Sequence, residues 1–361
     1  MAETDGAETD FDELVSRLQE LKKRQTTLLR DIRKLTSTLR NGGNPEHPEL
    51  YLKALSLLQP SQIAQHDQTT VTRNLRRQVP NTDSFWVSLV ERRRRKQLGF
   101  VPEKRLGIGK VKDMKIARAL NVPTVETLYQ GPWEDIPRET TETVVKPVNS
   151  SDSRGVFYLQ QDRFYSVHSG ESVDTWGEIE RVAAKQIEKD PNDTRWELQT
   201  LVTWRGHPAP DLKFYAFYGE IGAVLEVSRH DGAKYAFFDD KLRPARFTHD
   251  PLPRMNDLSD SFVMNGDLDE ASLEQVRAFS AKLPVPFLRI DYLGSDDGPV
   301  FCEFSSAPGR AHLFDKQTNM RLGKMYHEAE LRLVQDLLNG KGFDEYMRHP
   351  VSQELRDIGR R

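Results

Sequence analysis

The chain has 361 residues, a net charge of −3, 37% hydrophobic residues and 30% charged residues. This length allows one large domain or two plus an extension, and the nearly balanced charge gives no general attraction to nucleic acid or an anionic membrane. No apolar run approaches the ~20 residues needed to span a bilayer. The acidic N-terminal stretch lacks the apolar core of a signal peptide, and the single cysteine, Cys302, excludes internal disulfides and Cys-based zinc sites. We therefore expect a cytoplasmic protein.

Residues 1–43 are predicted to form a coiled-coil helix. Apolar residues follow one another in steps of three and four, with Gln25 the one polar member: Phe11, Leu14, Leu18, Leu21, Gln25, Leu28, Ile32, Leu35 and Leu39. This is a heptad repeat, and a polar residue at one seam position often fixes the register of a parallel dimer. The partner helix comes either from a second copy or from later in this chain. We favour a homodimer through residues 11–39.

Residues 44–100 are predicted to be a helical linker region that ends in the basic run from Glu91 to Lys96. Such a run is usually a solvated helix face. Its alternative role is to dock an acidic polymer or phosphate, and binding of that kind would be sensitive to salt.

Residues 101–345 are predicted to be one α+β domain, followed by a tail over residues 346–361. Helical patterns alternate with short β-rich runs and no internal repeat is visible. The predicted helices are 112–120, 175–189, 268–282 and 324–338. The predicted strands are 122–129, 142–147, 155–159, 197–203, 211–218, 222–227, 287–293 and 299–304.

The last two strands form a predicted hairpin around the turn Gly-Ser-Asp-Asp-Gly. If Leu293 lies opposite Pro299, alternation places four polar side chains on one face: Arg289, Asp291, Glu303 and Ser305. Two carboxylates about 4 Å apart repel each other by roughly 1–4 kcal/mol, and a divalent cation with hard oxygen ligands, such as magnesium, removes that penalty. The alternative is an exposed hairpin with solvated charges, which the apolar residues around these acids disfavour.

Three further groups are candidates for binding a nucleotide. Lys146 ends a strand and precedes a small-residue loop containing Ser150, Ser151 and Ser153, which offers donors to a phosphate. The strand from Glu197 to Val202 has an edge suited to a purine. Lys213, Arg229 and Arg310 are cations at strand ends or beyond the hairpin. Each group also has an ordinary reading, as a flexible loop, a plain sheet strand or surface charges.

Taken in order, these pieces resemble an ATP-grasp ligase, and specifically the TupA-like branch named for teichuronopeptide synthesis. The resemblance runs from Gly107 to Leu338 and rests on GKVKDMKIA, VVKPVNSSDSRGVFYL, ELQTLV, APDLKFYAFYGEIGAVLEVSRHDG, FFDDKLRPARF and FLRIDYL…GPVFCEFSSAPGRA. It implies an ATP-grasp fold, in which two α+β subdomains grip ATP.

The resemblance also implies roles for the candidate residues. Lys112, Lys146 and Lys213 would hold the nucleotide together with the serines of the 149–155 lid, and Gln199, Leu201 and Val202 would form the adenine hinge. Asp291, Glu303 and Ser305 would bind Mg²⁺, and the catalytic residues would be Arg289, Lys146 and Arg310. Two positions depart from the usual pattern. Ser305 stands where most ATP-grasp folds have asparagine, and Gln199 stands where this branch more often has glutamate.

The function implied is an ATP- and Mg²⁺-dependent carboxylate–amine ligase that forms an amide through an acylphosphate. Its acid and amine substrates would be linked to a cell-surface polysaccharide or a peptide-like metabolite, bound near Arg229, Arg310 and residues 230–265. The alternatives are a non-catalytic scaffold that binds nucleotide or glycan, and a phosphotransferase that stops at a phosphorylated product.

Overall fold

The computed structural model describes residues 5–41, 47–58, 63, 65–77, 83–98, 110–148, 153–160, 163–188, 191, 194–228, 234–248, 268–306, 308, 314–343 and 346. The chain divides into two compact units, Met1–Asp83 and Ser84–Arg361. No helix in the described ranges is both long enough and apolar enough to cross a membrane.

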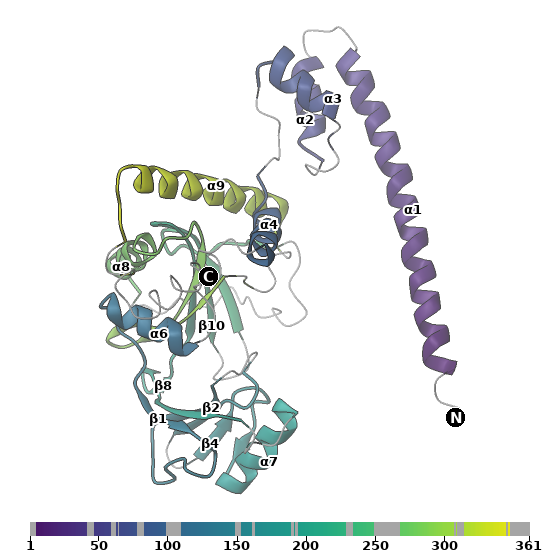
Figure 1. Ribbon diagram of the computed structural model, residues 1–361. Coiled ribbons are helices and arrows are strands. Elements are labelled where there is room, and N and C mark those ends of the chain that lie inside the picture. The colour runs from purple at the N-terminus through teal and green to yellow at the C-terminus, as the bar shows by residue number, and fades with distance from the viewer. Residues whose placement is uncertain are drawn as a thin grey trace. The chain divides into compact units, whose positions relative to one another are not determined.

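The first unit is helical (Figure 1). Its elements are α1 (Asp5–Asn41), α2 (His47–Leu55), α3 (Gln65–Thr69) and the π-helical turn η2 (Thr70–Asn74). A small core forms around Tyr51 and Leu55, and Ile32 and Leu39 of α1 pack against it. Beside this core, the buried carboxylate of Asp67 accepts hydrogen bonds from the Tyr51 hydroxyl at 2.7 Å and from Arg40 at 2.8 Å.

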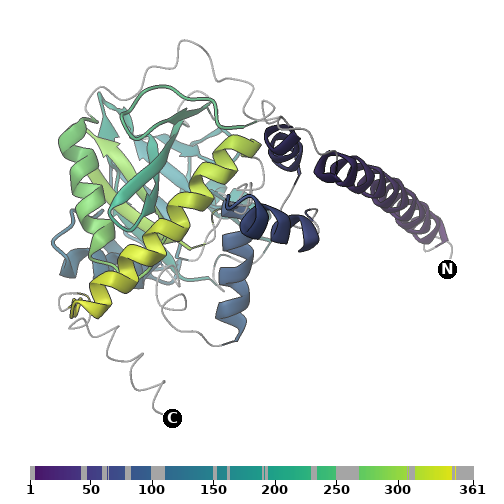
Figure 2. The ribbon, with the colours of Figure 1, turned by 90° about the horizontal axis from the view of Figure 1, so that it is seen from above.

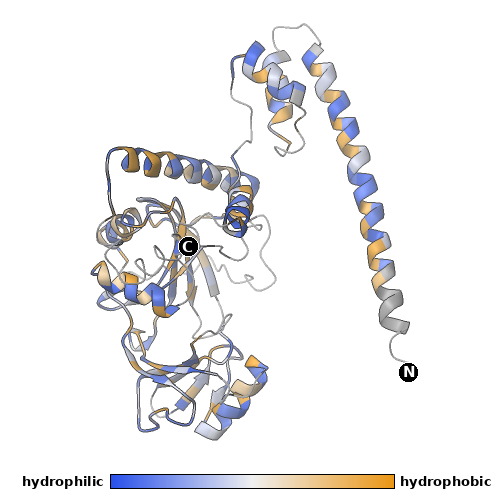
Figure 3. Cartoon of the chain, in the orientation of Figure 1, coloured by the Kyte–Doolittle hydropathy of each residue, from blue (hydrophilic) through white to orange (hydrophobic). Residues whose placement is uncertain are grey.

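The predicted seam of α1 is therefore divided between two environments. Ile32 and Leu39 find an apolar partner within their own chain. The other apolar seam residues remain exposed, with exposed fractions between 53% and 67%: Phe11, Leu14, Leu18, Leu21, Leu28 and Leu35. Figure 3 shows apolar positions interspersed with polar ones along α1. A coiled coil is not formed within the described part of this unit.

The second unit contains two large antiparallel sheets. The six-stranded sheet has the order β1-β6-β2-β3-β4-β5 and the five-stranded sheet the order β11-β10-β9-β12-β13. The strands of the first are β1 (Thr127–Gly131), β2 (Thr143–Pro147), β3 (Phe157–Gln160), β4 (Arg163–Ser166), β5 (Ser172–Val173) and β6 (Trp196–Thr200). Those of the second are β9 (Asp211–Phe217), β10 (Glu220–Ser228), β11 (Lys234–Phe238), β12 (Leu288–Ser295) and β13 (Gly298–Ser305). A two-stranded sheet pairs β7 (Thr203–Trp204) with β8 (His207–Pro208).

Each large sheet has its own helices and its own core. Helix α7 (Trp176–Ile187) packs through Ile179 and Ala183 on the six-stranded sheet. The five-stranded sheet is packed by α4 (Phe85–Gln97), α6 (Lys110–Ala119), α8 (Glu270–Ala281) and α9 (Lys316–Leu338). Figures 1 and 2 show α8 and α9 on the same side of this sheet. This α+β architecture of two sheets, each with its own core, agrees with the fold class predicted from the sequence.

Helix α4, which the sequence analysis placed in the linker region, packs on α9 within the second unit. Asn319 of α9 receives a hydrogen bond from the backbone N–H of Trp86 at 3.0 Å and donates one to the Ser84 hydroxyl at 3.0 Å. Gly323 of α9 permits the close approach, because a Cβ there would meet the backbone of Ser84 and Phe85. The start of α4 is therefore attached directly to α9.

We predict that Gly323→Ala separates α4 from α9 and destabilises the second unit. Added atoms at a close backbone contact typically cost roughly 1–3 kcal/mol. The matched control is Gly177→Ala in α7, where an added Cβ meets nothing within 4 Å and the same gain in helix propensity applies. Urea denaturation of both variants measures the difference. Equal stability of the two would contradict the proposed close contact.

Candidate functional site

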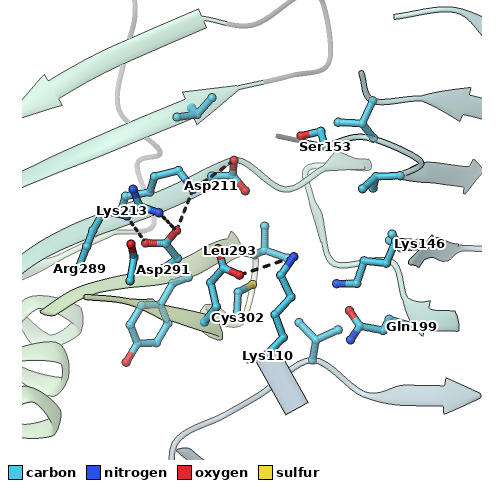
Figure 4. Close-up of a pocket in the computed structure, with 18 of the residues that line it drawn as sticks. Lys110, Lys146, Ser153, Gln199, Asp211, Lys213, Arg289, Asp291, Leu293 and Cys302 are labelled. Atoms are coloured by element: carbon cyan, nitrogen blue, oxygen red, sulfur yellow. Dashed lines mark hydrogen bonds and ion pairs between the residues drawn. The ribbon is translucent and has the colours of Figure 1, made fainter. Parts of the chain in front are cut away.

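One large pocket of about 1290 Å³ is lined by both sheets of the second unit. The five-stranded sheet contributes charged residues from β9, β12 and β13, and α6 contributes Lys110. The six-stranded sheet contributes Lys146 and Gln199, and Ser153 lies nearby in the pocket wall (Figure 4). Charged side chains from β2, β6, β9, β12, β13 and α6 therefore line one space.

The hairpin register differs from the one assumed from the sequence. Leu293 pairs with Val300, and Gly294 pairs with Pro299, so the assumed Leu293–Pro299 pair is wrong. Continued without interruption, this register would place Glu303 opposite Ile290, on the other face from Asp291.

A β-bulge corrects the alternation. The register shifts between Asp291 and Tyr292, Cys302 is the extra residue, and beyond it Asp291 pairs with Glu303 and Arg289 with Ser305. The four residues predicted to share a face do line one pocket, although by a different route from the one assumed.

Asp291 is the most strongly bound acid of the pocket. The Arg289 guanidinium donates to both its carboxylate oxygens, at 2.7 and 2.6 Å, and the Lys213 ammonium donates at 3.0 Å (Figure 4). Burial alone would raise the pKa of Asp291, but the charges of Lys213 and Arg289 outweigh it and hold the pKa below its usual range. This carboxylate is therefore ionised at neutral pH despite being buried.

Lys213 is held in its charged form in the same way. Burial opposes the charge, whereas the carboxylates of Asp211 and Asp291, at 3.6 and 3.0 Å from the ammonium, raise the pKa of Lys213 above its usual value. Asp211 was not among the predicted site residues. Its signal was its position two residues before Lys213 on the same strand, which places both side chains on one face.

Glu303 pairs with Lys110 of α6, whose ammonium lies 3.6 Å away. The sequence analysis chose Lys112 from this helix, but Lys112 is exposed and the pocket is lined by Lys110 and Lys115 instead. Residues two apart on an α-helix lie about 200° apart around its axis, so Lys110 and Lys112 cannot share a face. The available signal was the spacing of four between Lys110, Met114 and Arg118, which all line the pocket.

On the opposite wall, Lys146 of β2 pairs with Glu197 of β6 at 3.3 Å. Gln199 lies two residues along β6 on the same face, and its amide donates to Thr127 at 3.5 Å. Glu197 was named only as part of a strand, and alternation with Gln199 was the signal that could have found it. Leu201 and Val202, the predicted remainder of the adenine hinge, are not among the residues lining the pocket.

Several predicted residues lie outside the described part of the chain. These are Ser150 and Ser151 of the predicted lid, Arg229, Arg310, and most of the predicted acceptor region 230–265.

The residues present fit a metal that arrives with a nucleotide. Asp291 and Glu303 face each other across two strands, and Ser305 adds a hydroxyl oxygen on the same wall. No group of three or more His, Cys, Asp or Glu side chains suited to a metal occurs among the described residues. Magnesium is commonly bound by one or two carboxylates together with water and substrate phosphates, which matches this donor set.

Comparison with protein families identifies one match. The family described as "TupA-like ATPgrasp" matches residues 105–327, more than half of the chain. None of the curated proteins searched matches the sequence.

Solved structures of ATP-grasp ligases are also similar to the chain, at low identity. The ATP-grasp ligase PsnB with a minimal precursor is 14% identical, with a TM-score of 0.34, and the match covers 63% of this chain and 61% of PsnB. The D-alanine–D-alanine ligase of Bacillus anthracis with ATP is 15% identical, with a TM-score of 0.39, covering 68% of this chain and 75% of that one. The VanG D-Ala:D-Ser ligase of Enterococcus faecalis is 13% identical, with a TM-score of 0.38, covering 64% and 63%. The chain thus spans about three fifths of the length of PsnB.

We predict that Cys302 resists thiol reagents in the folded protein. Burial raises the pKa of its thiol to about 12, whereas an unfolded cysteine titrates near 8.5. Because only the thiolate reacts, modification at pH 8 should be more than about tenfold slower in the folded than in the unfolded protein. Reaction with a chromogenic disulfide, with and without denaturant, measures this ratio. Rates within tenfold of each other would show that the thiol is not shielded.

Proposed function

Because the chain belongs to the TupA-like ATP-grasp family, we propose that it is an ATP- and Mg²⁺-dependent carboxylate–amine ligase. The observation that carries the proposal is the pairing of buried cations and acids on one pocket wall. Lys213, Arg289 and Asp291 lie there within hydrogen-bonding distance, and Lys146 stands on the opposite wall of the same pocket.

The nucleotide phosphates bind between the two walls. Lys110, Lys146 and Lys213 supply positive charge, and Ser153 with Ser150 and Ser151 of the lid supplies hydroxyl donors. Gln199, which lines the pocket, contacts the adenine. Phosphoryl transfer depends mainly on cations fixed in position, and this pocket is rich in them.

Arg289 acts at the reacting end of the pocket, with Arg310 as a further proposed catalytic residue. The substrate carboxylate takes the terminal phosphoryl group of ATP to form an acylphosphate, and the guanidinium of Arg289 neutralises its charge. An amine then displaces phosphate to give the amide. Asp291, Glu303 and Ser305 would hold Mg²⁺, which neutralises phosphate charge when bound. The pairing of Arg289 with Asp291 keeps the guanidinium aimed into the pocket before any ligand arrives.

The substrates proposed are an acid and an amine attached to a cell-surface polysaccharide or a peptide-like metabolite, as the family resemblance implies. A cytoplasmic location suits a reaction that consumes ATP. A single cysteine, with no internal disulfide to form, is consistent with that compartment.

We further propose that α1 pairs with α1 of a second copy. The seam alternates between two heptad positions, and leucine occupies all of the second kind: Leu14, Leu21, Leu28 and Leu35. All four side chains are exposed. A helix with such a seam buries it most readily against an identical seam, and Gln25 at a central position limits the register.

We predict that the wild-type protein releases phosphate from ATP only when acid, amine and Mg²⁺ are present. Asp291→Asn and Glu303→Gln should lower the rate at least about a hundredfold, because each removes a carboxylate that would hold Mg²⁺ against the phosphates. Asp297→Asn, at the exposed tip of the same hairpin, is the matched control and should retain activity.

Product mass then separates the ligase from its alternatives. An amide supports the ligase, and a phosphorylated product would identify a phosphotransferase. Nucleotide binding without turnover, insensitive to Asp291, would identify a scaffold and contradict the proposal.

We predict that removing residues 1–43 converts a dimer to a monomer in sedimentation equilibrium. In the full chain, Leu18→Glu with Leu21→Glu should do the same, because each places charge in the seam. Ser16→Glu, on the outer side of the repeat, is the control and should leave the mass unchanged. If the protein without residues 1–43 still sediments as a dimer, α1 is excluded as the dimer contact.

A further inference from the structure

Arg92 differs from its neighbours in the basic run of α4. Arg93 and Arg94 are exposed, whereas Arg92 is only 3% exposed. Burial of a charged side chain is costly unless hydrogen bonds compensate it. Arg92 also precedes residue 105, where the family match begins, so its role does not follow from family membership.

One nitrogen of the Arg92 guanidinium contacts the residue that precedes β12 and the residue that follows β13. It donates to the carbonyl oxygen of Phe287 at 2.7 Å and to that of Ser306 at 3.3 Å. Phe287 lies two residues before Arg289, and Ser306 directly follows Ser305. Because Arg289 and Ser305 form the last pair at the open end of the hairpin, Arg92 joins the two strands just beyond that pair.

The hairpin needs such support because β13 lies at the edge of its sheet. On its outer side, the N–H of Phe304 donates to the buried carboxylate of Asp113 at 3.2 Å, and that of Phe301 donates to the Pro123 carbonyl at 2.8 Å. These contacts hold the middle of β13. Arg92 holds its end, next to Ser305.

Helix α4 is itself firmly placed, so the contact has a fixed origin. The ring of Phe85 packs edge-on against that of Phe287, with centroids 4.9 Å apart. Arg95 forms an ion pair with Glu330 of α9 at 2.9 Å. A side chain fixed on a rigid helix positions its partners more accurately than one on a loop.

We propose that Arg92 is a positioning residue for the metal–nucleotide site. By joining the carbonyl groups of Phe287 and Ser306, it sets the separation of Arg289 and Ser305 and keeps Glu303 opposite Asp291. This inference rests on the proposed function, since it assigns Arg92 to the same site.

The test compares the full-length wild type with Arg92→Met and Arg92→Lys, and Arg93→Met is the matched exposed control. Calorimetry measures binding of a non-hydrolysable ATP analogue with and without Mn²⁺, and hydrogen exchange is followed over residues 298–306. Loss of an outer support of a metal site typically lowers affinity 10- to 100-fold. We expect Arg92→Met to weaken metal-dependent binding about tenfold and to speed exchange in β13, with Arg92→Lys intermediate.

Binding without metal should change less than binding with Mn²⁺, because Lys146 and Gln199 on the other sheet would still contact the nucleotide. If Arg92 only stabilised the fold, Arg92→Met would lower the melting temperature, and the ratio of the affinities with and without Mn²⁺ would stay at the wild-type value. Wild-type exchange and affinity in Arg92→Met, or in Arg92→Lys if the first variant fails to fold, would overturn the inference. A wild type that binds no metal–nucleotide would overturn the proposed function, and unchanged exchange would separately refute the contact itself.

Discussion

The site depends on a β-bulge that accommodates one extra residue in β13. The turn at Asp296 and Asp297 sets a register in which Asp291 and Glu303 would face opposite sides of the sheet. The bulge at Cys302 sets two residues of β13 opposite one of β12, so Glu303 returns to the pocket face on which Asp291 lies. If Cys302 instead paired in the regular ladder opposite Asp291, Glu303 and Ser305 would face away from the pocket.

The bulge brings acids together, and the neighbouring strand supplies the opposing charge. Asp291 lies between Lys213 on one side and Glu303 on the other, since β12 pairs with both β9 and β13. Buried charges are tolerated when they are paired and hydrogen-bonded, and Asp291 accepts three such bonds. The buried charges of this wall are therefore paired with one another without a ligand. An incoming phosphate competes for the cations, while a divalent metal competes for the acids.

The alternation of side chains along a strand predicted which residues share the pocket face, because that alternation is a property of each strand by itself. It placed Arg289 with Asp291 and Glu303 with Ser305. Register and tertiary contacts were less accessible, because a bulge is not visible in composition and the choice between Lys110 and Lys112 depends on how α6 rotates against β13. The heptad pattern found α1, but Ile32 and Leu39 are used by a core that forms only when α2 folds back.

The charge of the basic run in α4 gives the wrong environment for one of its residues. Four consecutive arginines predict a solvent-exposed helix face, but Arg92 is buried. Counted by helical period, Arg92 follows Phe85, Ser88 and Leu89 at steps of seven, four and three, and all four side chains are buried. Position on the helix decided the environment, and the long arginine side chain spans from that buried face to two backbone carbonyl groups. A residue outside the region matched by the family therefore joins the open ends of the two strands that carry the candidate site.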